Sequence, residues 1–163
     1  INLVQGEDTF PNGKIYRGGS IDAVKHLSEI GHAQTIFNLR HRADYQVFDI
    51  AYHDFPMSNK IEKYDTSQKE VKRWLNQVIG SFQSEDIEYP VLIHCLSGKD
   101  RTGIVIAAIL LILGYKEDDI IEEYFFSEGE VKLELIQLAI NGMRPIEEYF
   151  EQIDLAIVRK HLK

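Results

Sequence analysis

The chain has 163 residues, of which 44% are hydrophobic and 27% charged, so it is long and apolar enough for one globular domain. Its formal net charge of −8 excludes broad nucleic-acid binding and polybasic docking on membranes, but not a local basic pocket. The longest apolar run, Ile104 to Leu113, is too short for a membrane span, so we expect no stable membrane insertion.

Cys95 is the only cysteine, so no disulfide can form within the chain. The sequence shows no internal repeat, linker or composition shift that would indicate a second domain. We therefore expect a single domain over residues 1–163, and a cytoplasmic monomer. The first residue is Ile1, which is also compatible with processing or trimming of a longer chain.

The first half of the chain alternates between strand and helix patterns. Short apolar stretches predict strands at residues 15–17, 35–39 and 47–55. Ser20 is a favourable N-cap for a helix over residues 21–30. Ser67 and Glu70 match a capping box, and the apolar spacing behind them predicts an amphipathic helix that reaches Phe82.

The second half begins with a wholly apolar strand at residues 90–94, the pattern of a strand buried in a parallel sheet. Residues 102–113 are apolar on nearly every side and predict a buried central helix. Further helices are predicted at residues 117–126, 130–140 and 145–160, the last with Pro145 in its first turn. This order predicts an α/β fold with a small, mostly parallel sheet, helices on both faces and a helical C-terminal third.

The loop between the strand at 90–94 and the following helix has the features of a phosphate-binding site. Backbone N–H groups converge in such a loop, and the helix N-terminus adds a partial positive charge. Arg101 can hold two phosphate oxygens with its planar guanidinium group. We expect the phosphate to be bound by Leu96, Ser97, Gly98, Lys99, Asp100 and Arg101.

The same positive field favours the thiolate form of Cys95, at the base of this loop. A thiolate below a bound phosphorus atom is a nucleophile for phosphoryl transfer. Thr102 can donate its hydroxyl to the sulfur, and His94 can support the loop through hydrogen bonds from its ring. The sequence therefore predicts Cys95 as nucleophile and Arg101 as phosphate clamp.

The spacing of these residues matches the signature HCxxGxxRTG, through His94, Cys95, Gly98, Arg101, Thr102 and Gly103. In this respect the sequence resembles the cysteine-dependent protein tyrosine phosphatase superfamily, and most of all its atypical dual-specificity branch, which acts on phosphotyrosine or inositol phosphates. The resemblance implies a protein tyrosine phosphatase-like fold and a two-step reaction through a phosphocysteine, with no metal and no cofactor. It is sharp over residues 90–114 and loose over residues 12–60.

Other readings of the loop fit the spacing less well. A nucleotide-binding Walker loop requires a glycine where Ile93 stands and a serine or threonine where Asp100 stands. A zinc site would need histidines at ligand spacing near Cys95, and none are so placed. A lone cysteine is commonly a small buried apolar residue, but here the glycine and arginine that follow it favour the nucleophile.

The sequence offers three candidates for the general acid that protonates the leaving group. The superfamily supplies it from an aspartate about thirty residues before the cysteine, and Asp65 lies 30 residues before Cys95. Asp65 also precedes a predicted helix, where aspartate commonly acts as a cap. Asp100, within the phosphate loop, and Glu62 are the alternatives.

Several cations follow strands that would end at the same edge of the sheet as the loop. They are Lys99 in the loop, then Arg40, His41, Arg42, Lys60 and Lys63. A focused positive site on an acidic chain favours an inositol polyphosphate or phosphoinositide substrate, with a phosphotyrosine protein as second choice. The partner would thus be a phosphorylated small molecule or a phosphoprotein. The alternative is a catalytically weak pseudophosphatase that only binds phosphate or recruits a partner.

Overall fold

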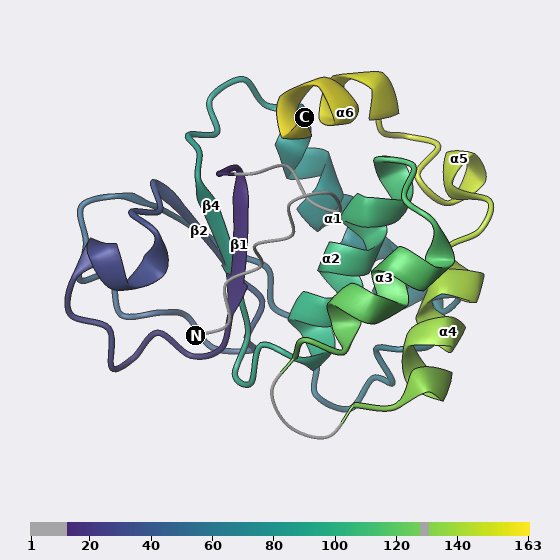
Figure 1. Cartoon of the computed structure of the whole chain (residues 1–163), viewed down its shortest axis with the longest axis horizontal. Helices are drawn as coiled ribbons and strands as arrows, with labels where there is room; N and C mark the ends of the chain where they lie inside the picture. The colour runs from purple at the N-terminus through teal and green to yellow at the C-terminus, as the bar shows by residue number, and fades with distance from the viewer. Residues whose placement is uncertain (1–12, 128–130) are drawn as a thin grey trace.

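The computed structural model describes residues 13–127 and 131–163 of the chain (Figure 1). Its strands β1 (Ile15–Gly18), β2 (Thr35–Asn38), β3 (Ala51–Asp54) and β4 (Val91–His94) form one sheet in the order β1-β4-β2-β3. All three strand pairings are parallel, and His94 lies between Gly18 and Asn38 in the register. The carboxyl ends of the strands therefore meet at one edge, where Cys95 follows β4.

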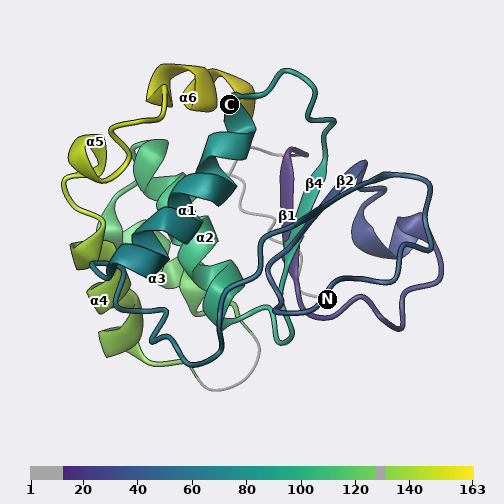
Figure 2. The same cartoon turned by 180° about the vertical axis from the view of Figure 1, so that it is seen from behind.

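The helices lie mainly on one face of the sheet. They are α1 (Lys69–Gly80), α2 (Asp100–Ile112), α3 (Glu117–Tyr124), α4 (Leu133–Gly142), α5 (Ile146–Tyr149) and α6 (Leu155–Leu162), with the 3-10 helix η2 (Ser81–Gln83) after α1. Figures 1 and 2 show them together on one side, whereas the 3-10 helix η1 (Leu27–Ile30) lies on the other. The predicted α/β fold with a parallel sheet is confirmed, and all residues of α2 from Arg101 to Ile112 are buried, as expected for a central helix.

The helix predicted over residues 21–30 is reduced to η1. The Ser20 hydroxyl accepts a hydrogen bond from the Asp22 N–H at 3.3 Å and starts a turn instead of a helix. Glu29 accepts hydrogen bonds from the backbone N–H groups of Lys25 and His26, at 2.9 and 2.8 Å, and so marks the start of the short helix at residue 27. The prediction was wrong for residues 21–26 because side chains bind the backbone groups that a longer helix would need.

The strand predicted over residues 47–55 is shortened to β3. Ala51 pairs with Thr35, the first residue of β2, so the residues before Ala51 have no neighbouring strand in the described part of the chain. Strand propensity alone therefore overestimated its length.

The capping box predicted for α1 is absent. The Ser67 hydroxyl donates to the Asp65 carboxylate at 2.6 Å, and α1 begins later, at Lys69. Asp65 thus removes Ser67 from its expected role as N-cap.

The helix predicted over residues 145–160 is two helices, α5 and α6, and Pro145 precedes α5 as its N-cap. The Asp154 carboxylate accepts hydrogen bonds from the N–H groups of Ala156 and Ile157 and starts α6 anew. The predicted start of the helix at 130–140 lies outside the described residues, since α4 is described from Leu133. In the described part of the chain, no helix is both long and apolar enough to cross a membrane.

Candidate active site

The loop of residues 95–101 joins the end of β4 to the first turn of α2 and rests on the end of β1. The Ser20 N–H donates to the Leu96 carbonyl at 2.9 Å. Gly98 has a φ of +73°, and a Cβ at this position would lie 2.7 Å from the carbonyl carbon of Gly18. Glycine at position 98 is thus required both by the left-handed conformation and by the close approach of the two backbones.

A buried ion pair supports the loop from β1 and α3. Arg17 Nη1 lies 2.7 Å from Glu123 Oε1, and the two side chains are only 1% and 4% exposed. Arg17 Nη2 donates to the Gly98 carbonyl and, at 2.6 Å, to the Ser127 hydroxyl. Burial raises the pKa of Glu123, and the adjacent guanidinium group opposes this rise. Arg17 is therefore paired with a counter-ion inside the protein, and it connects the loop to β1 and α3.

A cavity of about 410 Å³ opens above the loop. Cys95 is buried and contributes to its lining, together with residues from the segments after β2 and β3. The lining residues are Arg40, His41, Arg42, Asn59, Lys63, Cys95, Leu96, Ser97, Asp100 and Arg101. The structure thus brings the predicted nucleophile and the predicted phosphate clamp to one cavity.

Arg101 is held in this cavity by neutral oxygen atoms. Its Nη2 donates to the Met57 carbonyl and to the Asn59 side chain, both at 2.8 Å, and its Nη1 donates to the Leu39 carbonyl at 3.2 Å. Burial lowers the pKa of Arg101, while the nearby Cys95 and Asp100 act in the opposite direction. No ion pair to Arg101 is found among the described residues, although its side chain is 6% exposed. A buried cation without a counter-ion favours the binding of an anion.

Of the three candidate acids, the structure places Asp100 at the cavity. Its carboxylate accepts a hydrogen bond from the Tyr64 hydroxyl at 2.6 Å, and that hydroxyl is also 2.6 Å from the hydroxyl of Tyr124. Burial raises the pKa of Tyr64, and the hydrogen bond to Asp100 adds to the rise, so the phenol stays protonated and donates. Asp100 is thus oriented from behind by a pair of buried tyrosines.

Asp65 and Glu62 do not line the cavity. The Asp65 carboxylate accepts hydrogen bonds from the side chains of Ser67 and Gln68, at 2.6 and 3.3 Å. Glu62 is exposed and accepts from the Tyr64 N–H at 3.1 Å. Asp65 has the expected spacing of thirty residues before Cys95 but does not reach the cavity, because its carboxylate is hydrogen-bonded at the turn before α1.

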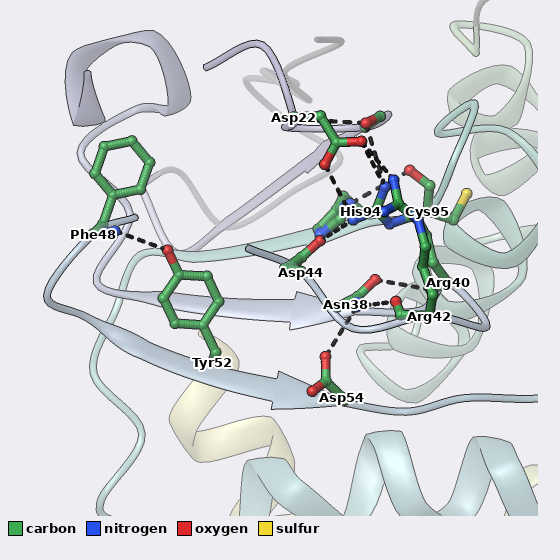
Figure 3. A network of polar contacts seen from close by, with 11 residues as sticks. Asp22, Asn38, Arg40, Arg42, Asp44, Phe48, Tyr52, Asp54, His94 and Cys95 are labelled. Atoms are coloured by element: carbon green, nitrogen blue, oxygen red, sulfur yellow. Dashed lines mark hydrogen bonds and ion pairs between the residues drawn. The ribbon is translucent and has the colours of Figure 1, made fainter. Parts of the chain in front are cut away.

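A polar network lies beneath the loop, around His94 (Figure 3). His94 is fully buried, and its Nε2 lies 2.7 Å from Asp44 Oδ2. The other oxygen of Asp44 binds Arg40, whose guanidinium also contacts Asp22 at 3.2 and 3.3 Å. The predicted supporting role of His94 thus involves Asp44, a carboxylate 50 residues away for which the sequence predicted no role. Its only sequence signal was its place in the charged loop after a predicted strand.

The cations predicted to face the cavity divide into two groups. Arg40, His41, Arg42 and Lys63 line it, whereas Lys60 and Lys99 do not. The predicted phosphate contact through the Lys99 side chain is therefore not supported, and the Lys99 N–H instead donates to the Ser97 hydroxyl at 3.3 Å. Arg42 is 2.8 Å from Asp22, so part of its charge is compensated within the protein.

The Thr102 hydroxyl is buried and makes no hydrogen bond within the described part of the chain. The predicted hydrogen bond from this hydroxyl to the Cys95 sulfur is therefore not formed in this structure. Leu96 is exposed at the rim of the cavity. The described residues contain no group of three or more histidine, cysteine, aspartate or glutamate side chains placed to hold a metal ion.

Several known proteins are similar to this chain in sequence or in fold. The chain is 48% identical over 42 residues to the triple specificity protein phosphatase PtpB of Mycobacterium tuberculosis, a match that covers 26% of this chain and 15% of that protein. Among solved structures, it is similar to the core catalytic domain of the PP-IP phosphatase SIW14 from S. cerevisiae, with a TM-score of 0.65 and 19% identity over 93% of this chain and 94% of that one. It is also similar to P. aeruginosa TpbA in complex with pTyr, with a TM-score of 0.56 and 17% identity over 98% of this chain and 95% of that one.

The two structural likenesses show the fold, and they agree with the parallel sheet described above. The family itself is shown by residues 4–153, which match the model of a family described as the tyrosine phosphatase family. The chain therefore belongs to the tyrosine phosphatase family, and the family predicted from the signature is confirmed.

Proposed function

We propose that residues 1–163 are a phosphatase domain that hydrolyses phosphomonoesters through a phosphocysteine on Cys95. The observation that carries the proposal is that Cys95 and the uncompensated cation of Arg101 line the same cavity. Arg101 and the N-terminus of α2 bind the phosphate dianion and present its phosphorus atom to the sulfur. Arg101 also stabilises the charge on the equatorial oxygens while the sulfur attacks.

The reaction has two steps. In the first, the Cys95 thiolate forms a bond to phosphorus, the bond to the leaving oxygen breaks, and Asp100 gives that oxygen a proton. In the second, Asp100 accepts a proton from water while the water oxygen attacks phosphorus and the sulfur leaves as a thiolate. Inorganic phosphate is released, and Cys95 and Asp100 regain their starting states.

We assign the acid to Asp100 because it is the carboxylate among the described lining residues of the cavity. The hydrogen bond from Tyr64 to one of its oxygens fixes the orientation of the carboxyl group. This arrangement departs from the spacing of the superfamily, in which a separate loop supplies the acid. The corresponding loop here, residues 56–65, instead supplies Asn59, which binds Arg101.

For the substrate we propose an inositol polyphosphate or phosphoinositide first, and a phosphotyrosine protein second. Lys63 lines the cavity and has no ion pair within the described residues, so its charge is free for a second phosphate. Arg42 is exposed and also lines the cavity. The solved relatives are compatible with both choices, since one is a PP-IP phosphatase and another binds pTyr.

The first experiment compares Asp100→Asn with Asp65→Asn on two phosphate esters. An aryl phosphate with an acidic leaving group needs little protonation, whereas an alkyl phosphate needs a proton. We expect Asp100→Asn to lower kcat/KM for the alkyl ester by about 10²–10⁴-fold and to affect the activated aryl ester much less. Asp65→Asn should leave the ratio of the two unchanged, and a selective loss in Asp65→Asn instead would refute the assignment.

The second experiment measures phosphate release from phosphotyrosine peptides, soluble inositol phosphates and phosphoinositide headgroups, with Cys95→Ser as control. Lys63→Ala should raise KM for polyphosphates by several-fold and leave KM for phosphotyrosine nearly unchanged, because only the former has a second phosphate to lose. An equal effect on both substrates would argue against the polyphosphate. Phosphate binding without any turnover that depends on Cys95 would support a pure binding module.

A further inference from the structure

Asn59 lies in a tight turn of the segment that follows β3. The turn is closed by a hydrogen bond from the Ile61 N–H to the Ser58 carbonyl at 3.3 Å, and a second one runs from the Lys60 N–H to the Ser58 hydroxyl at 3.2 Å. Asn59 is exposed, and it lines the cavity to which Cys95 contributes. The turn therefore fixes the backbone of Asn59 at the rim of the cavity.

The side chain of Asn59 is oriented by Arg101, the proposed phosphate clamp. Its amide oxygen lies 2.8 Å from Arg101 Nη2. A guanidinium group has donors and no acceptor, so the oxygen of the amide, and not its nitrogen, must face Arg101. The amide nitrogen carries two N–H donors and makes no hydrogen bond within the described residues. Both donors are therefore available to a ligand in the cavity.

Arg101 can bind a phosphate without releasing Asn59. Its Nη2 donates to Met57 and Asn59, and its Nη1 donates to Leu39. Its Nε is buried and has no hydrogen-bond partner in the part of the chain that the structure describes. A donor of Arg101 is thus left for a phosphate oxygen, and the contact that orients the amide is compatible with a bound substrate.

Asn59 and the phosphate site differ in their depth within the cavity. Cys95 and Arg101 are 4% and 6% exposed, so a phosphate between them lies deep, whereas Asn59 is exposed. The group esterified to that phosphate must extend from the depth toward solvent, past the rim. Lys63, four residues further along the same segment, also lines the cavity. This segment therefore offers the leaving group two kinds of hydrogen-bond donor, an amide and an ammonium group.

We propose that Asn59 binds the leaving group of the substrate by donating a hydrogen bond from its amide nitrogen to an oxygen atom beside the ester bond. The proposal rests on the phosphatase function proposed above and concerns what the site selects. A polyhydroxylated ring, as in an inositol phosphate, carries such an oxygen on the neighbouring carbons, whereas the ring of phosphotyrosine carries none. Asn59 is thus a specificity residue that favours polyol phosphates over aryl phosphates.

The test compares two secondary alkyl esters, an inositol monophosphate and cyclohexyl phosphate, which share a six-membered ring and differ in the ring hydroxyls. Asn59→Ala removes the donor. We expect the ratio of kcat/KM for the inositol ester to kcat/KM for the cyclohexyl ester to fall about threefold to tenfold, the effect of losing one neutral hydrogen bond. A change at Arg101 would act on both esters and cancel in the ratio. An unchanged ratio would overturn the proposal.

Two further variants test whether the amide donor is responsible. Asn59→Asp keeps an oxygen toward Arg101 and loses the N–H donors, so the ratio should fall as in Asn59→Ala, although the new carboxylate weakens the binding of both esters. Lys60→Ala changes the next residue of the turn, which does not line the cavity, and should leave the ratio at its wild-type value. A constant ratio in Asn59→Asp, or an equal fall in Lys60→Ala, would refute the role of the amide.

Binding measurements separate this proposal from the proposed function. Calorimetry of the two esters with Cys95→Ser needs no turnover, and a preference for the inositol ester that disappears when Asn59→Ala is added supports the proposal even if the chain hydrolyses neither ester. Hydrolysis of both esters with an unchanged ratio in Asn59→Ala would leave the phosphatase function intact and refute the role of Asn59.

A short-chain phosphoinositide is the third ligand, because its headgroup contains the same ring. The same loss with this ligand in Asn59→Ala would extend the assignment to lipid headgroups. A loss with the free inositol phosphate alone would restrict the assignment to soluble substrates.

Discussion

Two buried arginines adjoin the loop of residues 95–101, and their surroundings differ in one respect. Arg17 faces the carboxylate of Glu123 at 2.7 Å, whereas Arg101 is bonded only to neutral oxygens among the described residues. A buried charge is costly unless it is paired, so an unpaired one is kept where a ligand will pair it. The comparison separates an arginine that supports the structure from one that we propose binds the substrate phosphate, although both are nearly inaccessible.

The largest effect that tests this comparison is on stability, at Arg17. Arg17→Met would leave the buried carboxylate of Glu123 without a partner, and we expect a loss of about 3–5 kcal/mol in the free energy of unfolding. Chemical denaturation at neutral pH measures it. The double variant Arg17→Met/Glu123→Leu should recover a large part of the lost free energy of unfolding. A loss below about 1 kcal/mol in Arg17→Met alone would contradict a structural role for the pair.

Arg101 should show the opposite profile. Arg101→Lys removes the planar group that holds two phosphate oxygens, and we expect kcat/KM to fall by about 10²–10³-fold, which corresponds to about 2.7–4 kcal/mol of transition-state stabilisation. Its free energy of unfolding should stay the same or increase, since no carboxylate loses its partner. Steady-state kinetics and denaturation of one preparation measure both. If Arg101→Lys unfolds readily yet retains activity, Arg101 has a structural role and does not bind the substrate.

A smaller effect concerns the contact between the loop and β1. Gly98→Ala combines a left-handed backbone with a clash against Gly18, so we expect a loss of about 2–3 kcal/mol in stability. Gly114 has a φ of +89° but open space around it, which makes Gly114→Ala the matched control, with a cost of about 1–2 kcal/mol. Thermal denaturation of the two variants measures the difference. Equal losses would show that the loop can move away from β1 at no cost.

The smallest expected effect is at Asp22, the partly exposed carboxylate that binds Arg40. The hydrogen bond from Arg40 lowers the pKa of Asp22 from its ordinary value of 3.8. A lowered pKa in the folded state stabilises the fold above that ordinary value, and the contribution is lost as the pH falls through the folded-state value. Asp22→Asn should cost less than about 1 kcal/mol at pH 7, because the carboxylate is partly exposed and screened by solvent.

The cost of Asp22→Asn should decrease as the pH falls below 3.8 and vanish below the folded-state pKa, and urea denaturation at pH 7 and at a series of acidic pH values measures the change. A cost that persists in acid would show that packing, and not charge, is the origin of the effect.

The fold class of this protein could be predicted from the sequence alone, and so could the proposed chemistry of its loop. The proposed nucleophile and phosphate clamp follow from contiguous residues, because an apolar strand, a short loop and an apolar helix specify their own geometry. Helix and strand ends were less predictable. The helix predicted over 21–30 and the strand over 47–55 were too long, since side-chain hydrogen bonds and the extent of the neighbouring strand decided where each element begins.

The partners of the loop were decided by tertiary structure. Arg17 and Glu123 are 106 residues apart, and His94 and Asp44 are 50 apart. No periodicity or spacing relates such residues; they meet because β1, β4 and β2 lie side by side and bring the segments that follow them to one edge. The same packing turned Asp65 toward Ser67, placed Asp100 at the cavity and kept Lys99 out of it. Sequence thus determined which chemistry the loop can perform, and the fold decided which side chains assist it.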